Sequence, residues 1–156
     1  MGQTMLATDA IYGALAECFI TIDGNRYKFM QLTDFESKYE PNIVEIPILG
    51  QINKGHKPAG GKGTWSGTMY YNQSIMRKIM LDYQNTGVME PFDIMVTNED
   101  KGSKVGRQTI ILKGCLLDSI ILAKFVAGED TLEEDVSGTF ESFEMPEQFT
   151  PLVGME

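Results

Sequence analysis

The sequence predicts a mainly β fold, with two antiparallel sheets packed as a sandwich or open barrel and one α-helix at their side. Three observations support this. Roughly six or seven short runs alternate apolar and polar residues between turn-forming residues. A single stretch, beginning at Ile75, repeats its apolar residues at helical spacing. A long Gly- and Lys-rich segment separates strands in the first half. The length suits one domain over residues 1–156.

The first two strands form a predicted hairpin. Residues 17–22 are mostly apolar, residues 23–25 (Asp-Gly-Asn) supply a tight turn, and residues 26–29 alternate polar with aromatic side chains. The alternation then slips by one residue, because Met30 and Leu32 are both apolar. Such a slip indicates a bulge, or a bend where a long strand passes from one sheet to another.

Residues 42–63 are predicted to form a long loop. Within residues 50–63 there are five glycines, three lysines, one proline and no acid. Long loops without secondary structure are uncommon in compact domains and are usually functional or disordered. A strand is expected next over residues 64–71, with Trp65, Gly67, Met69 and Tyr71 on one face.

The helix follows, with Asn72 as its expected cap and Gly87 as its expected stop. The second half of the chain then returns to strands. Its predicted strands are residues 92–96, 108–117, 120–126 and 136–145. Residues 1–14 are expected to be an N-terminal arm and residues 147–156 a C-terminal tail. The apolar face of the helix is Ile75, Met76, Ile79, Met80 and Tyr83.

The charge is unevenly distributed. The net charge is −9, and no Lys or Arg follows Lys124. An acidic surface argues against specific nucleic-acid binding, which needs a basic patch. The acidic segment is either a solvated face that maintains solubility or a surface with a function of its own. Composition leaves both interpretations open. The acids after Lys124 are Glu129, Asp130, Glu133, Glu134, Asp135, Glu141, Glu144, Glu147 and Glu156.

Several function classes find no support in the residues. We expect no cofactor, because residues 55–63 resemble a phosphate-binding loop but lack its Gly-Lys-Ser/Thr ending. Cys18 and Cys115 are expected to be buried thiols, and with the lone His56 they are too few for a metal site. No membrane span and no basic leader are apparent, so we expect folding in a cytoplasm.

Two binding hypotheses remain. Lys54, Lys57 and Lys62 of the predicted loop are complementary to the acidic C-terminal segment, either within one subunit or head to tail between identical subunits. A small-molecule-binding β-barrel is the alternative, with Trp65, Tyr70 and Tyr71 as possible pocket residues.

The order of features resembles the tail tube proteins of contractile phage-like particles, the type found in PBSX-like prophages and R-type bacteriocins. The resemblance spans residues 11–149 and is carried by residues 63–71 (GTWSGTMYY), 106–112 (GRQTIIL), Asp118-Ser119, and 132–147 (LEEDVSGTFESFEMPE). The resemblance is carried by the ordered set of these segments. The related tube protein of type VI secretion is the alternative within this class.

This resemblance implies a structural subunit rather than an enzyme. Six copies would form a ring, their inner sheets would join around a channel, and the rings would stack. The implied partners are a sheath protein, a baseplate or tube initiator, a tape-measure protein and a tail terminator. Assembly in the bacterial cytoplasm and a place in a virion or released tail-like particle also follow. The implied inter-subunit contacts are Ile43, Val44, Ile46, Ile48, Lys54, His56, Lys57 and Lys62. The candidate channel or acidic-surface residues are Glu129, Asp130, Glu133, Glu134 and Asp135.

Overall fold

The computed structural model describes residues 5–29 and 32–152. Met30, the first residues of the N-terminal arm (1–4) and the last residues of the C-terminal tail (153–156) lie outside this range. Besides a short 3-10 helix at Ala7–Asp9 there is one α-helix, α1 (Ile75–Thr86), within the described residues. The strands are β1 (Ala16–Ile22), β2 (Asn25–Lys28), β3 (Leu32–Ile46), β4 (Gly55–Tyr70), β5 (Phe92–Glu99), β6 (Arg107–Ile120), β7 (Glu133–Phe140) and β8 (Ser142–Glu147).

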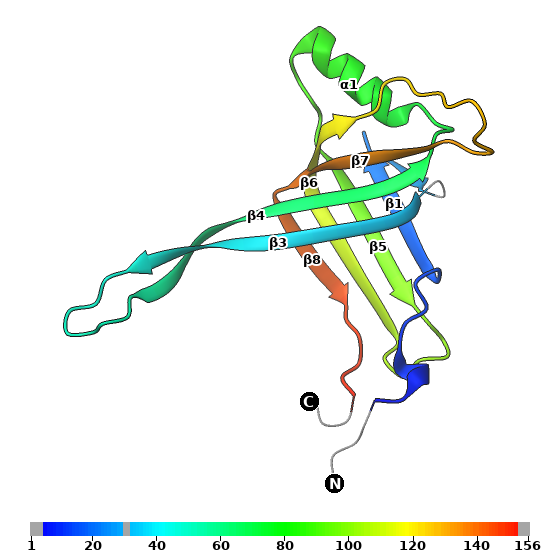
Figure 1. Ribbon diagram of the computed structural model, residues 1–156. Coiled ribbons are helices and arrows are strands. Elements are labelled where there is room, and N and C mark those ends of the chain that lie inside the picture. The colour runs from blue at the N-terminus through cyan, green and yellow to red at the C-terminus, as the bar shows by residue number, and fades with distance from the viewer. Residues whose placement is uncertain (1–4, 30–31, 153–156) are drawn as a thin grey trace.

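The strands form two layers that belong to one continuous path. The order is β2-β1-β5-β6-β7-β4-β3, with β8 beside β6, and all pairs are antiparallel. Sheet A contains β2, β1, β5, β8 and the first half of β6. Sheet B contains the second half of β6, then β7, β4 and β3. The strands of the two sheets cross at a steep angle in Figure 1. The predicted mainly β fold with packed sheets and one helix is confirmed, and the strand path does not close on itself.

A bend shared by β6 and its neighbour turns sheet A into sheet B. β6 pairs with β8 up to Lys113 and with β7 from Leu116 onward. Gly114, at the bend, has a φ of 70°, a left-handed conformation that glycine adopts at little cost. Opposite it, the N–H of Glu141 between β7 and β8 donates to the carbonyl of Lys113 at 3.0 Å. The bends in β6 and between β7 and β8 therefore fold sheet A and sheet B over a single core.

The predicted first hairpin is confirmed. Ile22 pairs with Asn25, which leaves Asp23 and Gly24 as a two-residue turn with φ values of 52° and 77°. Positive φ at both positions is the signature of a type I′ turn. β2 lies in sheet A and β3 in sheet B, so the chain changes sheets between Phe29 and Leu32. The predicted slip rests on Met30, which lies outside the described residues.

Trp65 lies at the centre of the core. Its ring contacts those of Phe35 and Phe92, and its Nε1 donates to the carbonyl of Thr139 at 3.2 Å. Gly138 is required beside it, because a Cβ there would collide with the Leu116 carbonyl and the indole. Apolar residues from both sheets, together with Phe29 after β2 and Met76 of α1, complete the core: Ile20, Phe29, Met69, Met76, Ile94, Leu112, Cys115, Leu117, Val136 and Phe140.

The helix covers one end of the core with its first half. Met76 is buried, whereas Tyr83 is 49% exposed, so the predicted apolar face is covered only in part. Gly87 ends the helix with a φ of 75°, as predicted. The predicted cap Asn72 is wrong. Ser74 holds the N-cap position. The Gln73 side chain accepts the N–H of Ile75 at 2.7 Å, and the helix begins at Ile75, later than predicted.

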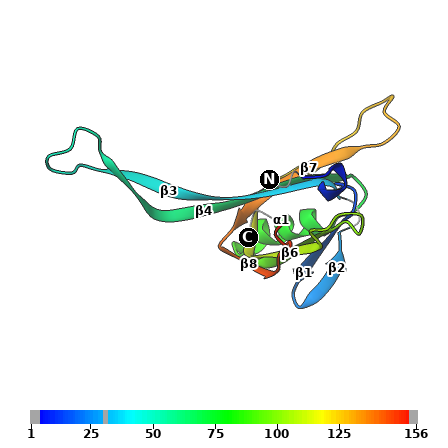
Figure 2. The ribbon, with the colours of Figure 1, turned by 90° about the horizontal axis from the view of Figure 1, so that it is seen from below.

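Two predicted boundaries need correction. The strand expected over residues 120–126 is wrong, since β6 ends at Ile120 and residues 121–132 form a connection to β7. The segment 42–63 is mostly strand rather than loop, because β3 and β4 continue through it as a paired hairpin and leave only residues 47–54 outside them. This hairpin projects far from the body in Figures 1 and 2.

Candidate assembly surfaces

The projecting hairpin, residues 42–63, is hereafter called the arm. Its backbone ladder pairs Ile43 with Pro58 and Ile46 with Gly55. A bulge between Pro41 and Ile43 accompanies Gly60, whose φ is 82°. The bulge shifts the register by one residue at the point where the hairpin leaves the body. The arm is thus a strand pair held by main-chain hydrogen bonds, and no other described element forms a second layer beneath it.

The arm exposes apolar side chains that its own subunit does not cover. Ile43 is 54% exposed, and Leu49 and Ile52 are fully exposed. Exposed apolar patches of this kind mark interaction sites in soluble proteins. Leu49 and Ile52 were missed by the sequence reasoning, although two large aliphatic residues in a Gly-rich turn were a usable signal. Of the predicted contact residues, Val44 is half-buried, and the exposed ones are Ile43, Ile46, Ile48, Lys54, His56, Lys57 and Lys62.

The arm is also basic. Lys54, Lys57 and Lys62 oppose a single acid, Glu45, which lies 3.7 Å from the Lys54 ammonium. Both members of that ion pair are more than half exposed, so the pair adds little stability. The lysine side chains of the arm are therefore available to a partner.

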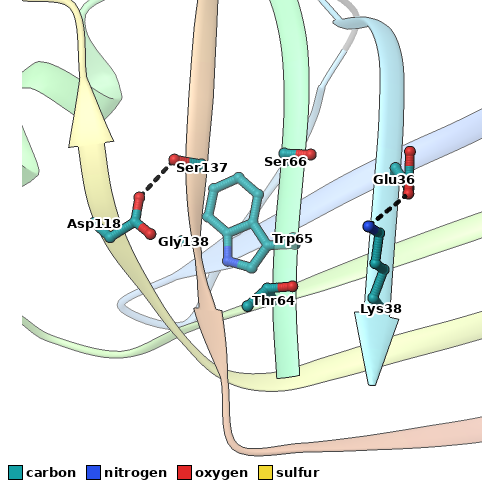
Figure 3. Close-up of a pocket in the computed structure, with 8 residues that line it drawn as sticks. All are labelled: Glu36, Lys38, Thr64, Trp65, Ser66, Asp118, Ser137 and Gly138. Atoms are coloured by element: carbon teal, nitrogen blue, oxygen red, sulfur yellow. Dashed lines mark hydrogen bonds and ion pairs between the residues drawn. The ribbon is translucent and has the colours of Figure 1, made fainter. Parts of the chain in front are cut away.

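The outer face of sheet B is polar, with hydroxyl-bearing and charged side chains in rows across the strands. The register aligns Glu36, Ser66 and Ser137 in one such row. Figure 3 shows this region, where the Ser137 hydroxyl donates to Asp118 at 2.5 Å and Lys38 lies 3.7 Å from Glu36. Five acids and one lysine make this face negative. Its polar residues are Asp34, Glu36, Lys38, Thr64, Ser66, Thr68, Asp118, Glu133, Asp135, Ser137 and Thr139.

The outer face of sheet A differs. Phe19, Met95 and Ile111 form a half-buried apolar row across β1, β5 and β6. Charged residues around this row are paired with one another, as Arg107 is with Glu147 at 2.5 Å and 2.8 Å. The Arg26 guanidinium lies 3.9 Å above the Phe19 ring. The outer face of sheet B is therefore polar and negative, whereas the outer face of sheet A is partly apolar and its charges are paired.

The end of sheet B opposite the arm is fastened by Arg77. Its guanidinium donates to the Gln73 carbonyl at 2.5 Å, to the Ile121 carbonyl at 3.1 Å, and to the carboxylate of Glu134. It also lies 4.4 Å above the Tyr71 ring. Helix α1, the connection 121–132 and β7 are thereby tied together. Arg77 was missed because it lies outside the apolar face that helical periodicity predicts for α1.

Glu134 does not belong to an acidic surface, and that prediction is wrong. Its side chain has no exposed area, because β7 alternates and turns Glu134 toward the core. Its neighbours Glu133 and Asp135 point outward from the same strand. Glu129 and Asp130 are exposed in the connection 121–132. The acids predicted as one cluster therefore divide between the outer face, the connection and the interior.

The candidate pocket residues do not share a site. Trp65 points into the core, Tyr70 points outward from the same strand, and Tyr71 stacks under Arg77. The thiols of Cys18 and Cys115 are free. Among the described residues no group of His, Cys, Asp or Glu could hold a metal ion, and no helix is long and apolar enough to cross a membrane.

With the fold and these surfaces in place, comparison with known proteins identifies the family. A model described as "Phage tail tube protein" matches residues 3–147. The chain belongs to this family. It is 31% identical over 148 residues to the phage-like element PBSX protein XkdM of Bacillus subtilis (strain 168), covering 95% of this chain and 98% of XkdM. Another protein of that strain, YqbM, is 32% identical over 146 residues, covering 94% of this chain and 97% of YqbM. The predicted family is confirmed.

Solved structures support the fold of this tail tube protein. The SPP1 tail tube gives a TM-score of 0.62 at 15% identity, covering 87% of this chain and 78% of that one. The sheath–tube complex of the extracellular contractile injection system PVC gives 0.63 at 12%, covering 87% and 90%. The tail of a gene transfer agent particle, described with C6 symmetry, gives 0.55 at 12%, covering 91% and 100%.

Proposed function

We propose that this tail tube protein assembles as a homo-hexameric ring, and that its rings stack into a hollow conduit inside a contractile sheath. Its role is mechanical and not catalytic. Its partners would be the sheath protein, a tube initiator at the baseplate, a tape-measure protein and a tail terminator. Subunits would assemble in the bacterial cytoplasm and leave it within a virion or a phage-tail-like particle. The sheath–tube complex and the C6 tail among its structural neighbours support this arrangement.

The arm is the observation that carries this proposal. A two-stranded hairpin is at best marginally stable on its own, and this one exposes several aliphatic side chains to water. Burial of these side chains on another copy would stabilise the assembly by about 25 cal/mol for each Å² of apolar area removed from water. The basic arm and the connection 121–132 with its exposed acids lie at different ends of the subunit, so a contact between them on neighbouring copies would be head to tail, which generates rings and filaments.

Sheet B supports closure of the ring. Its four strands alternate in direction from β3 to the second half of β6. Because rotation about a ring axis preserves strand direction, β3 of one copy would meet β6 of the next antiparallel. Within the described residues, no strand pairs with the outer edge of β3, or with Leu116–Ile120 on the side opposite β7. Ring closure would remove both free edges, which otherwise risk uncontrolled pairing.

The same closure would place the outer face of sheet B around the channel. Its hydroxyl-bearing and acidic residues fit a water-filled conduit, and its negative charge would repel a polyanion in transit. Glu133 and Asp135 remain channel candidates, joined by Asp34, Glu36 and Asp118. Glu129 and Asp130 would lie at the end of the subunit, where the basic arm of the next copy arrives. Charge complementarity would then guide stacking.

The proposal is tested by negative-stain electron microscopy across a concentration series. Hollow tubes or six-fold rings are expected, and the triple variant K54E/K57E/K62E is expected to need a higher concentration. The shift should shrink in high salt, because exposed charges are screened beyond about 10 Å at 0.1 M. K101E/K104E is the matched control, since both lysines are exposed in the β5–β6 turn. A chain that stays monomeric throughout the series contradicts the proposal.

A further inference from the structure

A second apolar surface lies at the end of the body opposite the arm. It is a groove of about 250 Å³ between the β1–β2 hairpin and the first turn of α1. Tyr27, 41% exposed, and Ile75, 39% exposed, line it from the two sides. The remaining lining residues are Ile20, Lys28, Phe29, Gln73 and Met76. No group of His, Cys, Asp or Glu that could hold a metal ion accompanies the groove in the described part of the chain.

We infer that this groove receives the apolar arm tip of another copy of the same chain, with Ile48, Leu49 and Ile52 as the inserted side chains. This inference rests on the proposed function and names the receptor that stacking needs. A second copy fits because this chain carries both a fully exposed aliphatic tip and an open apolar groove. The tip and the groove lie at different ends of one subunit, so the tip cannot occupy the groove of its own subunit.

The direction of β4 sets the geometry. The strand begins in the arm at Gly55 and ends at Tyr70, and the groove residues Gln73 and Ile75 follow directly. Figure 2 shows the arm on one side of the body and the β1–β2 hairpin on the other. From Gly55 to Lys62 the arm extends roughly 26 Å, at about 3.3 Å per residue. A copy displaced along β4 therefore presents its groove end to the arm of the copy before it.

Charge favours the same docking. Gln73 and Ile121 both accept hydrogen bonds from Arg77, so the groove lies next to the start of the connection 121–132, which further along carries the exposed acids Glu129 and Asp130. The arm approaches with Lys54 and Lys57 exposed beside the aliphatic tip. An aliphatic tip flanked by lysines would thus meet an apolar groove at the end of the subunit that also carries Glu129 and Asp130. Opposite charges would orient the arm, and apolar burial would hold it.

A designed disulfide tests the contact directly. The double variant L49C/Y27C, oxidised after assembly, should give a ladder of covalent oligomers on a non-reducing gel, because each subunit links to the next. The control L49C/K101C places the second thiol on the exposed β5–β6 turn, outside the groove, and should give no ladder. Burial raises the pKa of the natural Cys18 and Cys115 thiols to about 12, which keeps them protonated at pH 8. A ladder in the control and not in the test pair overturns the inference.

Substitutions on one helix provide an independent test. Ile75→Glu adds a charge at the groove, whereas Leu81→Glu alters an equally aliphatic, 53% exposed residue of α1 that does not line it. I75E should raise the concentration needed for stacking by roughly tenfold or more, as expected for the loss of a buried aliphatic contact. L81E should leave stacking unchanged. Tubes that form normally with I75E and yield no L49C/Y27C ladder refute this receptor and leave the tube function intact, whereas a wild type that never forms rings or tubes refutes the function itself.

Discussion

The two halves of β4 show how one strand can serve two purposes. From Gly63 to Tyr70 burial alternates residue by residue, with Trp65 and Met69 turned into the core. From Gly55 to Lys62 nearly every residue is exposed, although β3 remains its partner along the whole length. Main-chain pairing therefore extends through both halves, interrupted by the bulge near Gly60, and what differs is the presence of a second layer. The inner half stabilises the subunit, and the outer half has surface to bury on another molecule.

The largest effect that separates the body from the arm concerns Trp65, in the inner half of β4, and Leu49, at the arm tip. Trp65→Ala should lower the free energy of unfolding by about 3–5 kcal/mol, because it leaves a cavity among Phe35, Phe92 and Gly138. Leu49→Ala should leave it unchanged within about 0.5 kcal/mol, because Leu49 is fully exposed in the subunit. Urea unfolding of the unassembled subunit measures both. Equal losses would mean that the arm tip already packs against its own body.

The next effect concerns the ion pair between Arg77 and Glu134, at the end of sheet B opposite the arm. Arg77→Met removes the partner of Glu134, whose carboxylate has no exposed area and whose Oε1 already lacks a hydrogen bond. Leaving a buried charge without its partner costs on the order of 3–5 kcal/mol, reduced here because Arg77 itself is 17% exposed. Lys78→Met, at the adjacent exposed position, is the matched control. Thermal unfolding should separate the two variants clearly, and similar melting temperatures would show that the ion pair contributes little.

Much of the body was predictable because its local signals agree. The Asp23-Gly24 turn, the inward face of Trp65, Gly67 and Met69, and the Gly87 helix stop all appear as expected. Each depends on neighbouring residues only, either through a backbone conformation or through period-two burial. Such signals are sufficient to assign strands and to assign their buried faces.

The assembly surfaces were less predictable, because their composition points the wrong way. Glycine and proline in residues 50–63 indicate a loop, yet pairing with β3 makes most of this stretch a strand. Glu134 is acidic among acids, yet its burial depends on Arg77, which lies 57 residues earlier. Neither outcome can be read from local pattern, because each requires a partner that is distant in sequence. The groove likewise joins β2 to α1 across the long hairpin.

The smallest effect uses thiols to compare body and arm. Burial raises the pKa of Cys18 and of Cys115 from 9.0 to about 12, so the folded subunit keeps both thiols protonated where an unfolded chain would ionise them. The stability that this contributes is full below pH 9 and is lost as the pH rises toward 12. Alkylation at pH 8 should therefore be slow at both natural cysteines and fast at a thiol introduced by Ile52→Cys, which is fully exposed. On stacking, I52C should become protected while Cys18 and Cys115 stay unchanged. Mass spectrometry of the alkylated chain reads out all three sites, and an I52C thiol that stays reactive in assembled tubes would place the arm tip in solvent.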